Sequence, residues 1–558
     1  MKLRLEKKDK ILLSILIFLT FFRIVLAMKL PLFIQGNAMY DDALFIEYAN
    51  NILRLKWLGD FNFLTYAKGC SFSIFLVLNY ILGIPYSLSL ILLYIFSITL
   101  FIVTIKKIIN NRYFLFFTYI YLLFSPVMLH SENIQKVYRG GVITSFALIV
   151  ISGIIGMYTR ILDDKNKMKI YILISSVSLS FFCFLKEDSI WIMPFVIGGL
   201  FLTIVRVLKN EKKLICIIKQ SFKVLIPLFV LLLSNLTYKT VNYIYYGEFS
   251  ITDRNGTYFK DVINDLLIID DKSRNKNYWI TRSMLESAYK VSPTLNTIKD
   301  EMDKKYDSSW ADENGEIHGD IIYWVIKEAV NEEGIYQKGG KEVNKFYKKI
   351  HKELQKGFND GKIKKNEDFY ISSVAKGINK SELKEYLKFV KDSKRVLLTH
   401  SEYELGLFKA DGNANSIANF NEFTMSQFIL PDADENMYSL SLYFINISKK
   451  IVKFYSTTGI YLYNFFVISF ILFFIKIVKN IYVKKIDQEL ISKFLITLGI
   501  FINCIALFIG TTFFCRFLSF RKVYDYSSVI FPLIQIIEMI CFYEFFTIIK
   551  NLYRKLKN

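Results

Sequence analysis

The stretch GGVITSFALIVISGIIGMYT (140–159) runs for 20 residues without Asp, Glu, Lys or Arg. As an α-helix it extends about 30 Å, which matches the hydrocarbon core of a bilayer. Comparable apolar segments occupy nine other ranges: 11–29, 86–105, 113–129, 169–185, 189–207, 219–242, 452–477, 490–511 and 527–549. The sequence therefore predicts an α-helical polytopic membrane protein with about ten transmembrane helices.

The composition of the 558 residues agrees with this class. Apolar residues make up 53% and charged residues 22%, and the formal net charge is +21. These values exclude a disordered chain, a collagen and a small disulfide scaffold. The positive charge does not indicate nucleic-acid binding, because the basic residues lie between apolar segments rather than on one soluble patch.

The basic clusters predict the orientation of the chain. They lie at 2–10, 106–112, 160–169, 206–223, 476–493 and 550–557, and ten crossings place all of them on one side. The positive-inside rule makes that side cytoplasmic. We therefore expect a multi-pass plasma-membrane protein with both termini in the cytoplasm and a retained first span. The 14-residue segment 70–83 is too short to cross, and we expect a re-entrant or interfacial helix on the outer side.

This topology divides the chain into three parts. Residues 1–242 form an N-terminal membrane domain with seven spans, and 451–558 form a C-terminal membrane domain with three. Between them, 243–450 is polar and predicts a mostly helical extracytoplasmic insert. Helix-like stretches within it are 320–333, 341–357 and 380–392.

The first outer loop, MYDDALFIEYANNILRLKWLGDFNFLTYAKG (39–69), carries a tandem acidic pair, Asp41 and Asp42, directly before an amphipathic helix. One interpretation is structural, because an acid at a helix N-terminus caps it. A helix cap accounts for only one of the two aspartates. The second interpretation is a catalytic pair at the membrane surface.

Other outer loops add ionisable groups at the same level. They are Arg139 in the second loop, Lys186, Glu187 and Asp188 in the third, and Arg516 and Arg521 in the last. Snorkelling anchors explain some of these bases. The alternative is a cleft in which a carboxylate deprotonates an acceptor hydroxyl while Arg and Lys stabilise a departing lipid phosphate.

An N-terminal span, an outer loop with a tandem acidic pair and a short outer helix resemble the GT-C superfamily of integral-membrane glycosyltransferases. The greatest similarity is to the branch of protein O-mannosyltransferases and aminoarabinose transferases, with bacterial relatives that act on lipopolysaccharide and cell-wall glycans. The resemblance covers 1–242 and, more weakly, 451–549. The family pair is typically Asp-Glu, and its His-Pro-Pro element has no counterpart here. LTYAKGCSFSIF (64–75) occupies that place, with Lys68 where a donor phosphate would be contacted.

The resemblance implies an inverting glycosyltransferase that moves a sugar from a polyprenyl-phosphate donor to a cell-envelope acceptor at the outer face. Asp41 matches the catalytic base, and Asp42 would orient it or bind the glycan, lipid or protein acceptor. Residue chemistry adds Arg139, Lys186 and Arg516 or Arg521 as phosphate ligands. This branch uses no metal or other cofactor. Asp41, Asp42, Glu187 and Asp188 are compatible with a divalent metal ion, but no spacing indicates one.

Three alternatives remain open. A lipid or glycan transporter is expected to bury ionisable residues within its spans, whereas the sequence gathers most charges at span ends. A glycan polymerase or ligase shares the chemistry. The insert is otherwise a sensor or scaffold on an inert anchor. Within the insert, Tyr323 and Trp324 either pack in a core or stack on an acceptor sugar.

Overall fold

The computed structural model describes residues 6–162, 165–275, 277–370, 372, 374–484, 487–517 and 522–557. The described chain is built from helices, with isolated β-bridges as its only extended pairings. The α-helices are α1 (Lys7–Lys29), α2 (Asp42–Leu53), α3 (Ser71–Leu82), α4 (Tyr86–Ile105), α5 (Arg112–Leu123), α6 (Ser131–Ile134), α7 (Gly140–Arg160), α8 (Lys165–Cys183), α9 (Met193–Asn210), α10 (Leu214–Tyr246), α11 (Tyr258–Leu267), α12 (Arg282–Tyr289), α13 (Pro293–Asn296), α14 (Lys299–Tyr306), α15 (Ile321–Glu332), α16 (Gly340–Asn359), α17 (Lys380–Thr399), α18 (Ala414–Thr424), α19 (Ser439–Tyr482), α20 (Gln488–Phe517), α21 (Val523–Ser527) and α22 (Phe531–Lys557).

Short 3₁₀ turns join several of these helices. They are η1 (Pro126–Leu129), η2 (Ser189–Ile192), η3 (Tyr336–Lys338), η4 (Glu435–Tyr438) and η5 (Ser528–Ile530). Nine helical segments in the described residues are long and apolar enough to cross a membrane, so the chain is a multi-pass helical membrane protein. They contain α1, α4, α5, α7, α9, α10, α19, α20 and α22.

The expected tenth span, 169–185, corresponds to α8, which is not among those nine. Four serines between positions 175 and 180 lower its hydropathy. Nevertheless, α8 runs back along the whole of α7. Arg139, just before α7, donates to the carbonyl oxygen of Leu185, just after α8 (3.1 Å), while Arg160 at the other end of α7 stacks on Tyr171 near the start of α8 (4.7 Å). A tenth crossing stays a prediction that this antiparallel pairing supports.

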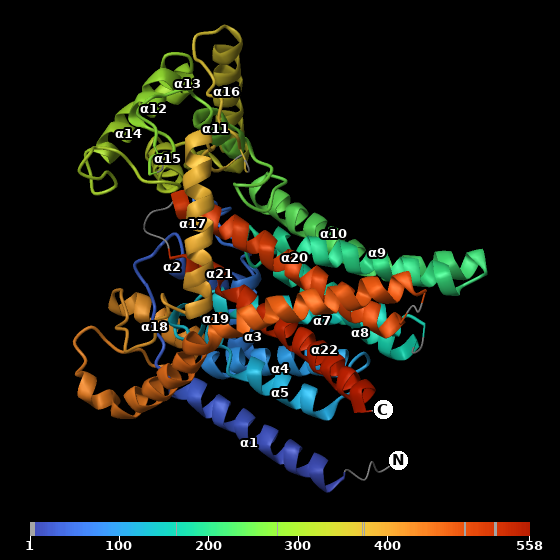
Figure 1. Cartoon of the computed structure of the whole chain (residues 1–558). Helices are drawn as coiled ribbons and strands as arrows, with labels where there is room; N and C mark the ends of the chain where they lie inside the picture. The colour runs from blue at the N-terminus through green and yellow to red at the C-terminus, as the bar shows by residue number, and fades with distance from the viewer. Residues whose placement is uncertain are drawn as a thin grey trace.

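The long helices form a bundle with two distinct ends (Figure 1). The terminal end carries the start of α1 and the end of α22, and Arg112 at the start of α5 pairs there with Glu6 (2.9 Å) and Asp9 (3.0 Å). The insert end carries the loop after α1 and the helices α11 to α17. Both termini therefore lie at the same end of the bundle.

Helix α7 lies at the centre of the bundle, against α4, α8 and α9. Small residues permit this close packing. A Cβ added to Gly156 would lie 2.0 Å from the ring of Tyr171, and one added to Gly153 would lie 2.4 Å from Ser175 Oγ. Glycine and serine at helix contacts are typical of membrane bundles, in which close backbone approach replaces the hydrophobic driving force.

Two ionisable side chains are buried within the long apolar helices. Arg23 of α1 donates to the carbonyl oxygens of Met128 (2.6 Å) and Leu123 (3.3 Å), where α5 ends. Positive charge is favourable at a helix C-terminus, so this contact stabilises the break after α5. Glu538 of α22 accepts a hydrogen bond from the Tyr121 hydroxyl (2.8 Å). The sequence expectation that charges gather at span ends is therefore incomplete.

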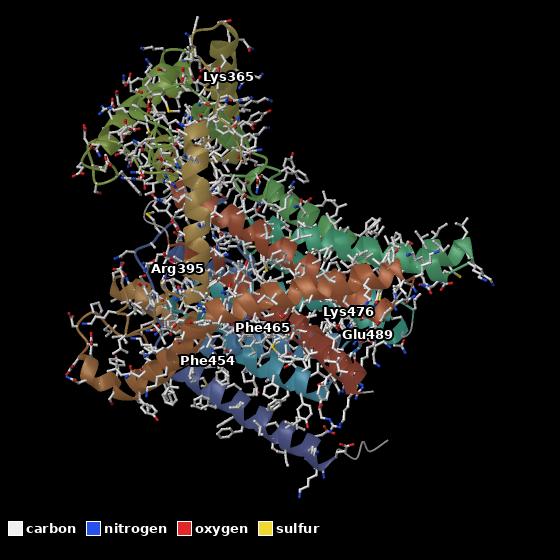
Figure 2. The ribbon with its side chains drawn as sticks, in the orientation of Figure 1. Lys365, Arg395, Phe454, Phe465, Lys476 and Glu489 are labelled. Atoms are coloured by element: carbon white, nitrogen blue, oxygen red, sulfur yellow. The ribbon has the colours of Figure 1, made fainter. Side chains whose placement is uncertain are left out.

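Paired charges lie near the turn between α19 and α20. Glu544 of α22 is buried and contacts Lys476 (2.8 Å) and Lys493 (2.9 Å), and Lys493 also contacts Glu489 (2.7 Å). Figure 2 shows Lys476 and Glu489 beside each other, far from the insert. This network satisfies carboxylates and ammonium groups that would otherwise be costly to bury.

The insert splits between two hydrophobic cores. Residues from Phe259 to Tyr386 form a core of their own, which also takes in Phe513 of α20. Residues from Leu397 to Phe428 instead pack into the core of the long helices. Helix α17 joins the two parts and contacts α19, α20 and α21. The compact unit of the insert is therefore shorter than the expected 243–450.

The three helix-like stretches of the insert agree closely with helices α15, α16 and α17. Asn379 begins α17 with a capping box, in which its side chain accepts from the Glu382 N–H (2.9 Å). The short apolar segment 70–83 forms α3, a 12-residue helix that packs against α2 and α18. Gly83 ends α3 in the left-handed region (φ 65°), where a glycine has no Cβ penalty.

Candidate functional site

The site lies at the insert end of the bundle, where the loop after α1 meets the start of α7 and the turn between α8 and α9. Backbone pairing fixes this loop. Phe33 N–H donates to Gln135 O (2.9 Å) and Val137 N–H donates to Phe33 O (3.2 Å). The segment before α7 is thereby held beside the segment before α2, and the side chains of both point into one cluster.

Asp41 occupies the N-cap position of α2, yet its side chain makes no capping hydrogen bond within the described chain. Its Oδ1 instead lies 2.6 Å from Lys68 Nζ and accepts a hydrogen bond from the Tyr138 hydroxyl (3.0 Å). The capping interpretation is therefore wrong for this side chain. Asp41 is 38% exposed, whereas Lys68 is 11% exposed.

These contacts keep Asp41 ionised. Burial acts to raise its pKa, but the charge and hydrogen bond of Lys68, helped by Arg139 and Tyr138, outweigh it and lower the pKa to about 2. An ionised, partly exposed carboxylate is a proton acceptor, although one so strongly held is a weak base. The pairing with Lys68 thus limits what Asp41 can do in this state.

Asp42 differs sharply from its neighbour, because it is fully buried. Its Oδ2 accepts from the Gln35 N–H (3.1 Å), Lys136 Nζ lies 3.8 Å from Oδ1, and Oδ1 has no hydrogen-bond partner among the described residues. Burial raises the pKa of Asp42 to about 7 against the opposing charge of Lys136. Its burial suits a role in holding the loop better than direct contact with an acceptor.

Arg139 is buried beside this pair. One guanidinium nitrogen donates to both oxygens of Glu187 (3.1 and 3.2 Å) and to Leu185 O, and the guanidinium carbon lies over the rings of Tyr138 (5.5 Å) and Phe45 (5.6 Å). Burial would raise the pKa of Glu187, but Arg139 and Lys68 lower it to about 2. Both groups are therefore charged and mutually neutralised.

The other bases predicted to bind phosphate are also paired. Lys186 contacts Asp188 (2.8 Å) and lies over the ring of Tyr526 (4.8 Å). Arg516 of α20 pairs with Glu385 of α17. Arg521 lies outside the described residues. The described contacts thus gather Asp41, Asp42, Lys68, Arg139 and Glu187 into one cluster, with Lys186 and Asp188 in the adjacent turn.

Sequence reasoning placed Lys136 with Arg139 in the second outer loop but missed Tyr138. Lys136 bonds Gln35 Oε1 (2.9 Å), and Tyr138 stands between Asp41 and Arg139. The position of Tyr138 directly before Arg139, in a short loop between two spans, is the signal that marks it. Arg254, which stacks on Trp324 (5.8 Å), carries no comparable signal, because it lies far away in the sequence.

Trp324 of α15 borders the site from the insert. Its ring lies 5.9 Å from Lys68 Nζ and 4.8 Å from the ring of Tyr40. Tyr323, in contrast, is buried in the core of the insert and donates to Val374 O (3.1 Å). The two aromatic residues therefore have different environments: Tyr323 packs in a core, and Trp324 lies half-buried beside the cluster.

The described residues contain no group of three or more His, Cys, Asp and Glu side chains close enough to hold a metal ion. The ionisable cluster pairs each carboxylate with a base rather than with another carboxylate. No protein-family model, curated protein or solved structure matches the chain.

Proposed function

We propose that the protein is an inverting glycosyltransferase that moves a sugar from a polyprenyl-phosphate donor to a cell-envelope acceptor at the insert end of the bundle. The observation that carries this proposal is the contact between Asp41 and Lys68, an ionised base joined to a phosphate-binding cation. Their place at one end of a membrane bundle suits a donor whose tail lies in the bilayer and whose headgroup lies at its surface.

In this mechanism the donor phosphate binds Lys68 and breaks the ion pair between Lys68 and Asp41. The phosphodiester of the donor carries one negative charge, as a carboxylate does, and accepts charge-assisted hydrogen bonds, so it can compete with Asp41 for Lys68; the phosphate monoester that leaves gains a further charge. Loss of Lys68 removes the main influence that lowers the pKa of Asp41, so burial then raises it. Binding of the donor would thereby convert Asp41 from a masked carboxylate into an effective base.

The transfer step then uses both groups. Asp41 takes the proton of the acceptor hydroxyl while the acceptor oxygen forms a bond to the anomeric carbon. The bond between that carbon and the phosphate oxygen breaks, and polyprenyl phosphate leaves with the bonding pair. Lys68 stabilises the developing charge, and attack from the opposite face inverts the anomeric carbon.

Arg139 serves a different purpose in this scheme. Its guanidinium already bonds two oxygens of Glu187 and a backbone carbonyl, so release to a phosphate would leave a buried carboxylate unpaired. We therefore assign Arg139 to holding the turn after α8 and lowering the pKa of Asp41 at a distance. Lys186, paired to a more exposed aspartate, remains a second candidate for the phosphate.

The direct test is binding of a polyprenyl phosphate, here decaprenyl phosphate, because a lipid phosphate of this class is the part that all such donors share whatever their sugar. The purified full-length protein in nanodiscs should bind it, and Lys68→Ala should weaken binding by roughly 10- to 100-fold, as expected for one lost charged contact. Lys522→Ala is a matched control, because Lys522 also pairs with a carboxylate, that of Glu404, at this end. Equal binding by wild type and Lys68→Ala contradicts the proposal.

A lipid or glycan transporter is the second candidate, favoured by the buried Glu538 and Arg23. Ionisable side chains inside membrane helices commonly mark transport or proton pathways. Glu538→Gln should abolish flux into proteoliposomes if this candidate is correct, and leave sugar transfer unchanged if it is not. A polymerase or ligase uses the same transfer step and is distinguished by a repeating or block-transferred product.

A further inference from the structure

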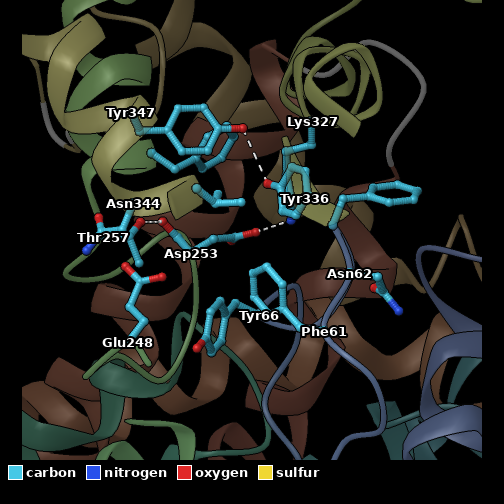
Figure 3. Close-up of a pocket in the computed structure, with 13 residues that line it drawn as sticks. Phe61, Asn62, Tyr66, Glu248, Asp253, Thr257, Lys327, Tyr336, Asn344 and Tyr347 are labelled. Carbon is cyan, nitrogen blue, oxygen red and sulfur yellow. Dashed lines mark hydrogen bonds and ion pairs between the residues drawn. The ribbon is translucent and has the colours of Figure 1, made fainter. Parts of the chain in front are cut away.

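A small, partly open cavity lies between the first loop, the segment after α10 and helices α15 and α16 (Figure 3). About 20 Å³ of it is open to a water-sized sphere. That space holds a single water molecule or a small ion and is too small for a sugar. Its polar lining consists of Asn62, Tyr66, Glu248, Asp253, Thr257, Lys327, Tyr336, Asn344 and Tyr347.

Glu248 is the unusual member of this lining. It is only 7% exposed, and its Oε1 has no hydrogen-bond partner in the described part of the chain. The ion pairs among the described residues do not include it. Burial, with a smaller contribution from Asp253, raises the pKa of Glu248 to about 7. A buried carboxylate without a counter-charge is costly, so a native site normally supplies a partner.

Two further oxygen atoms of the lining, Tyr66 Oη and Asn344 Oδ1, are buried and have no hydrogen-bond partner among the residues that the structure describes. In Figure 3 the carboxyl group of Glu248 points toward Asn344 and Asp253. Asp253 is already neutralised, because Lys327 donates to its Oδ2. The cavity lining therefore contains three such buried oxygen atoms, one of which belongs to a carboxylate outside the ion pairs of the described residues.

We propose that this cavity binds one monovalent metal cation, Na⁺ or K⁺, through Glu248 with oxygens of Asn344 and Tyr66. Alkali cations, like other hard cations, prefer oxygen ligands. One positive charge matches the single carboxylate that lacks a partner. A divalent ion would require more carboxylates, and the nearby ammonium group of Lys327 would repel it twice as strongly.

The position of the cavity gives the ion a structural role that does not depend on the proposed transfer reaction. Tyr66 belongs to the first loop, two residues before Lys68, and its carbonyl oxygen accepts from the Asp253 N–H (3.0 Å). Glu248 follows the end of α10, and Asn344 lies in α16 of the insert. A bound cation would therefore fasten the first loop to the insert and fix the position of Lys68.

The test measures thermal unfolding of the purified full-length protein in NaCl, KCl or choline chloride at constant ionic strength. The proposal expects a saturable rise in Tm of roughly 2–5 °C with Na⁺ or K⁺ and none with choline. Glu248→Gln should remove this dependence. Glu538→Gln is a matched control, since Glu538 is also a buried carboxylate but lies in α22, away from the cavity.

A second variant covers the case in which Glu248→Gln does not fold. Asn344→Asp adds a negative charge to the same cavity and should lower the half-saturating cation concentration by roughly 3- to 10-fold. Equal Tm values of the wild type in all three salts, or full cation dependence in Glu248→Gln, would overturn the proposal. In those cases the cavity holds water beside a protonated Glu248. Because the readout is stability, neither result bears on sugar transfer.

Discussion

Lys68 Nζ lies 2.6 Å from Asp41 Oδ1, so the candidate base and the candidate phosphate ligand neutralise each other in this structure. The two residues lie 27 positions apart in the sequence and meet over the start of α2. Trp324 from the insert covers Lys68 on one side. The basicity of Asp41 therefore depends on whether another anion binds Lys68 in its place.

Removal of this contact should change the stability of the protein in a pH-dependent way. The pKa of Asp41 is lowered to about 2 from an ordinary value of 3.8, so its contribution to stability is present above about pH 4 and is lost as pH falls toward 2. Wild type should therefore exceed Lys68→Met in Tm most clearly at pH 7. The difference should shrink between pH 4 and pH 2. A difference that does not vary with pH would show that Lys68 stabilises only through packing.

The buried pair of Arg139 and Glu187 should be sensitive to loss of one partner. Glu187→Gln leaves the guanidinium charge uncompensated, which typically costs about 3–5 kcal/mol of unfolding free energy. The double variant Arg139→Gln with Glu187→Gln should recover part of that loss. Denaturant unfolding of the four proteins gives the coupling energy. A coupling near zero would mean that solvent already screens the pair.

The two neighbouring aromatic residues of α15 should respond differently to truncation. Tyr323 is buried in the core of the insert, and Tyr323→Ala should cost about 3–5 kcal/mol of stability. Trp324 is half-buried beside Lys68 and Tyr40, so Trp324→Ala should raise the acceptor KM while the protein remains folded. Steady-state kinetics and thermal unfolding on both variants separate the effects. Loss of folding in Trp324→Ala would show that Trp324 packs in the core rather than contacting the acceptor.

The orientation of the bundle can be measured with single cysteines. Ser308 is exposed on the insert, and Asn551 is exposed at the terminal end. If the basic clusters face the cytoplasm, a membrane-impermeant thiol reagent should label Ser308→Cys in intact cells and Asn551→Cys only after permeabilisation. The native cysteines provide the background in the parent chain. The reverse labelling pattern would place the insert inside the cell.

The sequence was sufficient for local features and insufficient for contacts between distant segments. Apolar runs predicted the long helices, because one helix needs about 20 such residues to cross a bilayer. The same signal predicted the serine-rich α8, but the antiparallel packing of α8 against α7 could not be predicted from it. Asp41 and Asp42 are adjacent in the chain, yet only the folded loop decides that one is buried and the other open. The contact of Trp324 with Lys68 likewise depends on how the insert docks.

The substitution Asp41→Asn separates catalysis from structure most directly. Asparagine keeps the size of the side chain and accepts a hydrogen bond from Tyr138, but it cannot take a proton from an acceptor. General-base contributions are about 100- to 10,000-fold, so sugar transfer should slow by that factor. Binding of decaprenyl phosphate should be retained or improve, because the variant has no ion pair between Lys68 and residue 41 that the phosphate must break.

This combination of slower transfer with retained phosphate binding is specific to a base that is masked by its own phosphate ligand. If Asp41 served only to position Lys68, Asp41→Asn would weaken phosphate binding along with transfer. Asp41→Glu offers a further contrast, since it keeps the proton acceptor and displaces it by one methylene, and it should retain more activity than Asp41→Asn. Near-normal transfer by Asp41→Asn in proteoliposomes would remove Asp41 as the base. The search would then move to Glu187, because Asp42 is buried and beyond the reach of an acceptor.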